Sequence, residues 1–347
     1  MIHSSLSVSI PTFLLAAVSL GLVRPTEEID FSPRFAEGQS LTIEQSFSMD
    51  GVLDDLSVVL DGAEVVGGGV DVEMEVDMSM EYGEEIVAVR DGEIAQVLLT
   101  VEDQTGSFNG FFDAMGESDS IDEPIETSLV GHTFEITVDE EGETEVDDVT
   151  EGDVAPADED EMLGLTHRNH FESFLPTEAL DVGAEFDLAE PWLDEAREMM
   201  DSEMLGDLAE MEPEALDFIE ALTESMFGGT ELEATGTIRE LEDGIATIDY
   251  DVSGFMSIDD LVSLIASAMP PEIGGEIPPG VEAVLEASFE MEGTGTYDVA
   301  LGLMVGLELK GEYQVLFSGN ADVQGSSGEA EATFSGAFSS TASITAE

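Results

Sequence analysis

The stretch Val70–Asp103, VDVEMEVDMSMEYGEEIVAVRDGEIAQVLLTVED, decides how the N-terminal part of this chain folds. From Val70 to Glu81, apolar and polar residues alternate almost strictly, which is typical of a β-strand with one buried and one solvated face. Asp91-Gly92 then lies between two apolar runs, which is a strong hairpin signal. The stretch therefore predicts two antiparallel strands joined by a tight turn.

Similar strand patterns occur on both sides of a different central region. Hairpin turns are expected at Glu141-Gly142 and at Asp243-Gly244, and further strands run from Val281 to the end. The expected elements between the strand regions are an acidic linker at 151–161, a helix at 158–174, a short strand at 182–188, one or two helices at 191–229 and a short helix at 258–269. A sheet with one apolar face must cover that face, so we expect an α+β fold. Its curved, half-barrel-like antiparallel sheet or sheets would be covered by the central α-helices.

The composition divides the chain into four regions. They are a hydrophobic N-terminal segment at 1–25, a β region at 38–150, a helical middle with one short strand at 151–229, and a second β region with one short helix at 230–347. We expect the last three to form one composite domain. Within the first region, Ile10–Val23 is too short for a comfortable membrane span and suits the apolar part of a secretory signal peptide. The interpretation favours export to the periplasm, cell envelope or exterior, without a stable membrane span after signal removal; a short membrane anchor is the alternative.

The charge balance is extreme. The sequence has 81 acidic residues against seven Lys and Arg, which gives a formal net charge of −74. Self-repulsion of this size destabilises a compact state, and a Debye length of about 3 Å at 1 M salt would relieve most of it. Adaptation to salt is the favoured explanation, and collection of Ca²⁺ is the alternative. A chain without a basic footprint is not expected to bind nucleic acid.

The motifs needed for catalysis are missing from the sequence. The chain has no cysteine, which excludes disulfides, thiolate catalysis and Cys-ligated metal centres. No GxSxG motif is present, and no pair of carboxylates stands out among so many. We therefore predict a protein that is not an enzyme, with no catalytic residue and no cofactor beyond weak surface Ca²⁺.

Two histidines are the only candidates for a metal site. His167 and His170 fall on one face of the expected helix, but that face offers no third ligand. A structural interpretation is therefore preferred, in which His170 and Arg168 complement the negative end of the helix. The segment Val138–Asp148 resembles an ion-binding loop only weakly, and a hairpin turn explains it more simply.

The apolar residues give the remaining functional signal. The chain has sixteen methionines, and many of them lie on strand faces or in the central region, where they suit irregular apolar space. An exported non-enzymatic protein that binds a lipid, another apolar ligand or a protein partner between sheet and helices is the first hypothesis. The second is a structural or surface interaction protein whose acidic shell holds cations, and a metal-dependent hydrolase using His167 and His170 is the third.

Three segments resemble an uncharacterised family of exported bacterial envelope proteins. They are LVGHTFEITVDEEGETE (Leu129–Glu145), FLPTEALDVGAEFDL (Phe174–Leu188) and EGTGTYDVALGLMVGLELKGEYQV (Glu292–Val315). Ala184 and Phe186 stand where the family usually has Asp and Trp, and no lipobox cysteine is present. The architecture that this resemblance implies is similar to periplasmic lipoprotein-carrier and lipid-carrier lipoproteins. It implies a curved sheet and export, and no established activity.

Overall fold

The structure of this chain is a computed structural model. It describes residues 28–67, 70–90, 92–114, 117–125, 127–139, 144–150, 152, 156–157, 171–193, 228–258, 262, 281–323 and 326–346. Of the part described, 77% lies in strands and 4% in helical conformation. The fold is therefore nearly all β.

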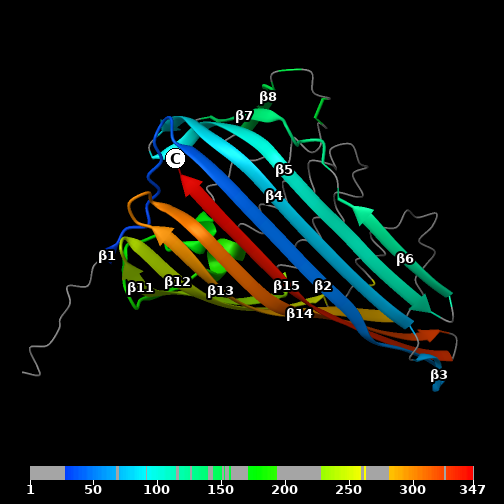
Figure 1. Cartoon of the computed structure of the whole chain (residues 1–347). Helices are drawn as coiled ribbons and strands as arrows, with labels where there is room; N and C mark the ends of the chain where they lie inside the picture. Colours follow the sequence, from blue (N-terminus) through cyan, green and yellow to red (C-terminus); the bar gives the residue numbers. More distant parts are fainter. Residues whose placement is uncertain are drawn as a thin grey trace, which may run out of the picture.

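Thirteen of the described strands form one antiparallel sheet (Figure 1). The strands are β1 (Glu28–Ile29), β2 (Ser40–Leu60), β3 (Ala63–Gly67), β4 (Val70–Arg90), β5 (Glu93–Ala114), β6 (Glu117–Pro124), β7 (Thr133–Val138), β8 (Thr144–Asp148), β9 (Leu180–Asp181), β10 (Glu185–Asp187), β11 (Thr230–Glu242), β12 (Ile245–Ile258), β13 (Val281–Asp298), β14 (Leu303–Val323) and β15 (Ser326–Ala346). The main path is β10-β11-β12-β13-β14-β15-β2-β4-β5-β7-β8, while β3 pairs with β2 and β6 pairs with β5. A two-stranded sheet of β1 and β9 lies apart from it.

The two β regions of the sequence are joined through the pairing of β15 with β2. The register runs from Ala346 opposite Leu41 to Gly328 opposite Leu60. Figure 1 shows β15, in red, lying beside the blue β2 along most of its length. Strands far apart in the sequence thus make one continuous surface.

The alternation of residues gives this sheet two different faces. Side chains directly opposite each other in an antiparallel pair project to the same face. One transverse row is Glu233, Ser253, Glu290, Glu312, Ala337, Asp50, Glu75, Asn109 and Asp122. A neighbouring row on the other side is Ala234, Val252, Met291, Gly311, Phe338, Met49, Val76 and Phe108. We call these sides the acidic face and the apolar face.

Glycines on the apolar face make room for aromatic rings. A Cβ atom added at Gly254 would lie 2.1 Å from Cε1 of Phe289, on the neighbouring strand. At Gly311 the same atom would lie 2.6 Å from Cζ of Phe338. Glycine inside a strand normally weakens the strand. Here the neighbouring aromatic ring fills the space that a side chain would occupy, so each strand continues beyond its glycine.

The buried core forms two clusters on the apolar side, near the β11–β12 and β4–β5 turns. In the first, Ile238, Ile248 and Tyr297 are fully buried. In the second, Ile43, Ile86 and Phe134 are fully buried. The first cluster also packs against the loop segment that contains the short 3-10 helix Glu172–Phe174 and the helical residues 189–193. Burial of this kind contributes roughly 1.5–3 kcal/mol for each large apolar side chain.

Loop residues are tied to this core by hydrogen bonds to backbone carbonyls. The indole Nε1 of Trp192 donates to the carbonyl of Ser173 at 2.7 Å. The hydroxyl of Tyr250 donates to the carbonyl of Phe174 at 2.9 Å, and the rings of Phe174 and Trp192 pack edge to face with centroids 4.8 Å apart. These contacts fix the loop over the end of the apolar face.

The α+β fold with a half-barrel covered by central helices is a wrong prediction for the described residues. A single sheet spans both β regions, because β15 pairs with β2. Its central strands β2, β4, β5, β14 and β15 each continue for 21 or 22 residues. The end of the helix expected at 158–174 is a 3-10 turn that begins after Phe171, whose φ is 61°. Residues 158–170, and most of the helices expected at 191–229 and 258–269, lie outside the described residues.

The side chains on the apolar face of Val70–Glu81, which the alternation predicts to be buried, are only partly buried. Val70, Val72, Met74 and Val76 on the apolar face are only partly buried, and Met78 is 39% exposed. The apolar face is fully buried where loops cover it and half-exposed farther along the strands.

Candidate functional site

The residues proposed for a metal site cannot be placed. His167 and His170 lie outside the described residues. Among the residues that the structure does describe, no group of three or more His, Asp or Glu side chains could hold a metal ion. The segment Val138–Asp148 spans the β7–β8 hairpin, in which Val138 pairs with Thr144, and its residues 140–143 are outside the description.

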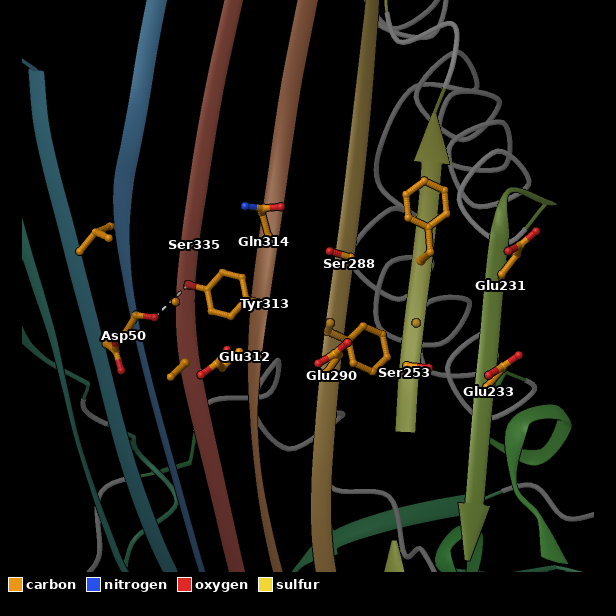
Figure 2. A pocket seen from close by; sticks show the side chains of 16 residues that line it. Asp50, Glu231, Glu233, Ser253, Ser288, Glu290, Glu312, Tyr313, Gln314 and Ser335 are labelled. Carbon is orange, nitrogen blue, oxygen red and sulfur yellow. Dashed lines mark hydrogen bonds between the residues drawn. The ribbon is translucent and has the colours of Figure 1, made fainter. Parts of the chain in front are cut away.

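A long hollow runs across the acidic face and is the candidate site. Figure 2 shows one part of it, where Glu231 and Glu233 of β11, Glu290 of β13, Glu312 of β14 and Asp50 of β2 lie around the same space. This part has a volume of about 760 Å³. The sheet itself builds the hollow, since every one of these side chains projects from a strand.

Four such hollows share lining residues and form one surface. Asp50 belongs to three of them, and Lys310 and Glu292 connect the second to another hollow of about 440 Å³. The carboxylates that line them are Asp50, Glu73, Glu75, Asp122, Glu231, Glu233, Asp249, Asp251, Glu290, Glu292, Glu308 and Glu312. Lys310 is the single cation among the lining residues.

The cations near these carboxylates neutralise few of them. The Nζ atom of Lys310 lies 3.1 Å from Oε1 of Glu292, and both side chains are well exposed. Nη1 of Arg239 donates to Oδ1 of Asp249 at 3.0 Å. Exposed pairs of this kind contribute little to stability, because water and salt screen them. The hollow is therefore strongly negative, and its remaining charge is balanced by dissolved cations.

Three apolar side chains interrupt this polar surface. Phe255, Val52 and Phe111 project to the acidic face with exposed fractions of 40%, 41% and 38%. They belong to one transverse row, next to the row of Glu290 and Asp50. Polar residues separate them in that row: Ser288, Gln314 and Ser335 lie between Phe255 and Val52, and Glu73 lies between Val52 and Phe111. The acidic face thus offers three separate apolar anchors beside the carboxylates.

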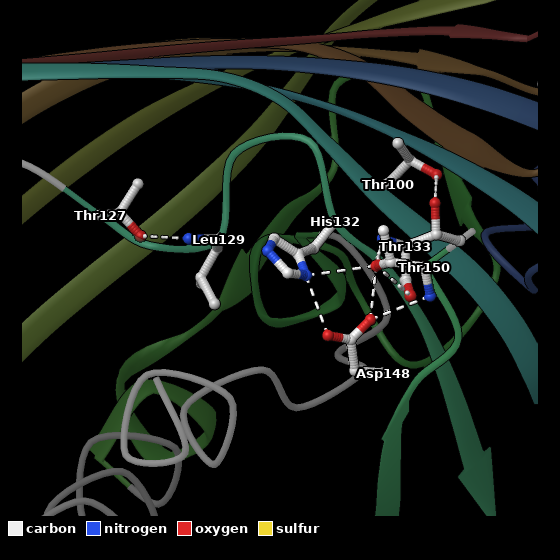
Figure 3. A network of polar contacts seen from close by, with 7 residues as sticks. All are labelled: Thr100, Thr127, Leu129, His132, Thr133, Asp148 and Thr150. Carbon is white, nitrogen blue, oxygen red and sulfur yellow. Dashed lines mark hydrogen bonds and ion pairs between the residues drawn. The ribbon is translucent and has the colours of Figure 1, made fainter. Parts of the chain in front are cut away.

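A second polar cluster surrounds His132, at the start of β7 (Figure 3). His132 is 2% exposed, and its Nδ1 lies 2.9 Å from Oδ2 of Asp148 and 3.2 Å from Oγ1 of Thr150. The Thr150 hydroxyl donates to Oδ1 of Asp148 and accepts from the backbone N–H of Thr133 at 2.9 Å. The hydrogen bonds from Thr150, with a smaller effect of His132, hold the pKa of the Asp148 carboxyl below its usual range.

The chemistry of this cluster is structural. Asp148 and Thr150 both contact the same ring nitrogen of His132, whereas a catalytic triad needs the acid and the nucleophile on opposite nitrogens. The cluster joins the end of β8 to the loop before β7 and closes the hairpin. The sequence pattern did not single out His132. Asp148 and Thr150 follow it by 16 and 18 residues, a separation that a β-hairpin can bring together.

Buried tyrosines serve as anchors in the same way. Burial raises the pKa of Tyr297 to about 12, and its hydroxyl donates to the backbone carbonyl of Asp30 at 3.3 Å. Burial and the nearby charge of Glu84 raise the pKa of Tyr82, whose hydroxyl accepts from Nε2 of Gln45 at 3.2 Å. These hydroxyls stay protonated and bind within the protein, so they are unsuited to proton transfer at neutral pH.

Comparison with known proteins gives no family for this chain. No family model and no curated protein matches it. Three solved structures share 7–8% identity: Pseudomonas putida OprB at low pH (86% of this chain, 92% of that chain, TM-score 0.21), Pseudomonas aeruginosa OccK7 (89% and 100%, 0.17) and the COG4313 outer membrane channel from Pseudomonas putida F1 (93% and 100%, 0.15). TM-scores this low support no argument about fold or function.

The resemblance to an uncharacterised family of exported envelope proteins, and to lipoprotein carriers, is wrong. No family model matches the chain, and the described fold is a continuous long-stranded sheet. Separately, none of the described helical residues belongs to a helix long and apolar enough to cross a membrane.

Proposed function

We propose that this chain is an exported, non-enzymatic structural or surface interaction protein whose acidic sheet face holds a layer of hydrated cations. The observation that supports this most directly is the row of carboxylates that crosses the sheet from Glu233 to Asp122. The row lies on one face of a sheet that joins both β regions, so its charge belongs to a single surface.

The physical argument concerns repulsion between neighbouring strands. Glu290 lies directly opposite Glu312, and Asp50 lies directly opposite Glu75. Like charges in such positions destabilise an antiparallel pair by up to about 1 kcal/mol. A sheet with this design is favoured in concentrated salt, where the Debye length is about 3 Å at 1 M. The proposal therefore includes a salty medium as the setting in which the protein works.

Export is supported by the sequence. Ile10–Val23 has the length and composition of a signal-peptide core, and it lies outside the described residues. The absence of cysteine from the sequence excludes lipid attachment through an N-terminal cysteine. Cell-envelope or extracellular localisation remains part of the proposal.

Binding of a lipid or another apolar ligand is the second candidate. It is favoured by the half-exposed residues of the apolar face, among which Phe47, Met78 and Phe112 have exposed fractions of 36%, 39% and 46%. Against it, the four hollows described above open on the acidic face. A lipid carrier would need its apolar surface to be enclosed around the ligand.

Native mass spectrometry of the protein purified from its own host tests both candidates, with lipid and metal analysis of the same sample. The first candidate predicts a protein without stoichiometric lipid, and Na⁺, K⁺ or Ca²⁺ that exchange freely on dialysis. Lipid retained at near one molecule per chain would contradict it and establish the second candidate. Fractionation of the host cells, with detection of the protein by antibody, tests export in parallel; a cytoplasmic protein would refute that part.

A further inference from the structure

We propose that the hollow on the acidic face is a docking surface for a basic amphipathic helix of a partner protein, laid across the strands. This goes beyond the cation layer, because it assigns the face a partner of defined chemistry. Lys and Arg side chains of that helix would replace dissolved cations along the carboxylate row. Its apolar side chains would contact Phe255, Val52 and Phe111.

Charge complementarity gives the sign of the partner. Twelve carboxylates line the connected hollows, and Lys310 is the single lining cation. The contact of Lys310 with Glu292 at 3.1 Å shows how an ammonium group is accepted on this surface. Acidic proteins and nucleic acids would be repelled, and each cation displaced by the partner would return to solution.

The apolar row gives the partner its second property. Phe255, Val52 and Phe111 lie in one transverse row beside the carboxylates, and their exposed fractions are 40%, 41% and 38%. A purely hydrated surface does not require three exposed apolar side chains in one row, whereas docking would remove them from water. The favoured partner is therefore amphipathic and not simply polycationic.

The spacing of the anchors fits a helix. Phe255 on β12 and Val52 on β2 are four strand positions apart, which is about 19 Å at roughly 4.8 Å per strand. Val52 and Phe111 on β5 are two positions apart, or about 10 Å. Measured from Phe111, Val52 therefore lies at about 10 Å and Phe255 at about 29 Å. With 3.6 residues per turn and a rise of about 1.5 Å per residue, helix residues i, i+7 and i+18 lie on one face, at about 0, 10.5 and 27 Å along the axis. Apolar side chains on a single helical face would thus meet all three anchors.

A synthetic peptide tests the proposal. The probe is a Leu/Lys peptide of about 20 residues, long enough to span roughly 30 Å as a helix, with all leucines on one face. Its control is a scrambled peptide of the same composition, which has the same charge and no apolar face. Binding is measured by fluorescence anisotropy against the full chain, at the lowest salt concentration at which the protein remains folded.

Substitution of the anchors separates docking from simple charge attraction. The double variant Phe111→Ser with Phe255→Ser should bind the amphipathic probe at least about tenfold more weakly and the scrambled peptide unchanged. The matched control is Phe112→Ser, which changes the same residue type on the same strand but on the opposite face, and which should bind both peptides as the natural chain does. Circular dichroism melting verifies that each variant is folded.

Three results would overturn the proposal. The first is equal affinity for the amphipathic and the scrambled peptide, which would leave charge alone as the cause of binding. The second is an equal loss of affinity in Phe112→Ser and in the double variant. The third is no binding of either peptide to the folded protein. The cation layer of the proposed function would survive each of these results, since it does not depend on the apolar row.

Discussion

Glu290 and Glu312 lie directly opposite each other on β13 and β14, and their repulsion can be measured. Opposite Cβ atoms in an antiparallel pair are about 5 Å apart. Two carboxylates about 6 Å apart in water repel each other by about 0.7 kcal/mol. At about 0.1 M NaCl the Debye length is about 10 Å, so we expect a double-mutant cycle of Glu290→Gln and Glu312→Gln to give an unfavourable coupling of about 0.4 kcal/mol. At about 1 M NaCl, with the Debye length reduced to about 3 Å, the coupling should fall close to zero.

The assay is thermal unfolding followed by circular dichroism at both salt concentrations. With an unfolding entropy of about 2.1 cal/mol/K per residue, the coupling at about 0.1 M NaCl corresponds to a shift of roughly 0.5 °C in Tm. The matched control is a cycle of Glu290→Gln with Glu329→Gln, since Glu329 faces Asn320 and Val59 and no carboxylate. That cycle should be additive. A Glu290–Glu312 coupling that is absent in low salt, or that persists unchanged at 1 M, would refute the alignment of like charges across the acidic face.

Three further predictions concern stability. Gly254→Ala should destabilise the fold by about 1–3 kcal/mol, because the new Cβ would overlap the ring of Phe289. Gly319→Ala should lower the free energy of unfolding by less, because the nearest atom to its new Cβ would be 3.5 Å away. Urea unfolding of the two variants compares these losses. Ile248→Ala should cost about 2–5 kcal/mol in the same assay, because the side chain is fully buried in the core. Asp148→Asn removes a carboxylate whose pKa is lowered in the fold, so its stabilising effect is present above the unfolded pKa near 4 and is lost as the pH falls through the folded pKa. The Tm of the natural chain should therefore exceed that of the variant at about pH 6, and this difference should shrink as the pH falls to about 3.

Local features of the fold could be predicted from the sequence. Asp243-Gly244 forms the expected turn, with φ of 52° and 85° at its two residues, because a two-residue hairpin needs positive φ at both positions. The hairpin around Gly92 is confirmed by the pairing of Arg90 with Glu93, and the hairpin of β7 and β8 by the pairing of Val138 with Thr144; the turn expected at Glu141-Gly142 lies outside the described residues. Each of these depends on residues that are close together in the chain, so the pattern contains the information.

Long-range features could not be predicted in this way. The pairing of β15 with β2 joins residues about as far apart as the chain allows, and neither strand pattern identifies its partner. Gly51 lies inside β2, where a Cβ would meet the Tyr313 hydroxyl and the Phe334 ring, and only the neighbouring strands reveal this role. The alternation of residues predicts which face of the sheet each carboxylate occupies. Which carboxylates are neighbours across the strands depends on the strand register, and the sequence pattern does not contain it.

The candidate site shows the same division. The excess of acid and the exclusion of polyanionic ligands were evident from composition, whereas the hollow and its three apolar anchors depend on which strands are neighbours. The two histidines that sequence reasoning singled out, His167 and His170, lie outside the described residues. His132 escaped attention because its partners, Asp148 and Thr150, become neighbours only when the hairpin forms.

The most direct test of the account is the melting temperature of the full chain as NaCl is raised from about 0.1 M to about 2 M, with KCl at matched ionic strength. If the acidic face is stabilised by screening and by mobile cations, Tm should rise continuously through the molar range and should rise alike in both salts. A Tm that does not change with salt would contradict the central claim. A Tm that reaches its maximum with micromolar Ca²⁺ in low salt would contradict it as well, and would show instead that the chain binds Ca²⁺ at defined sites.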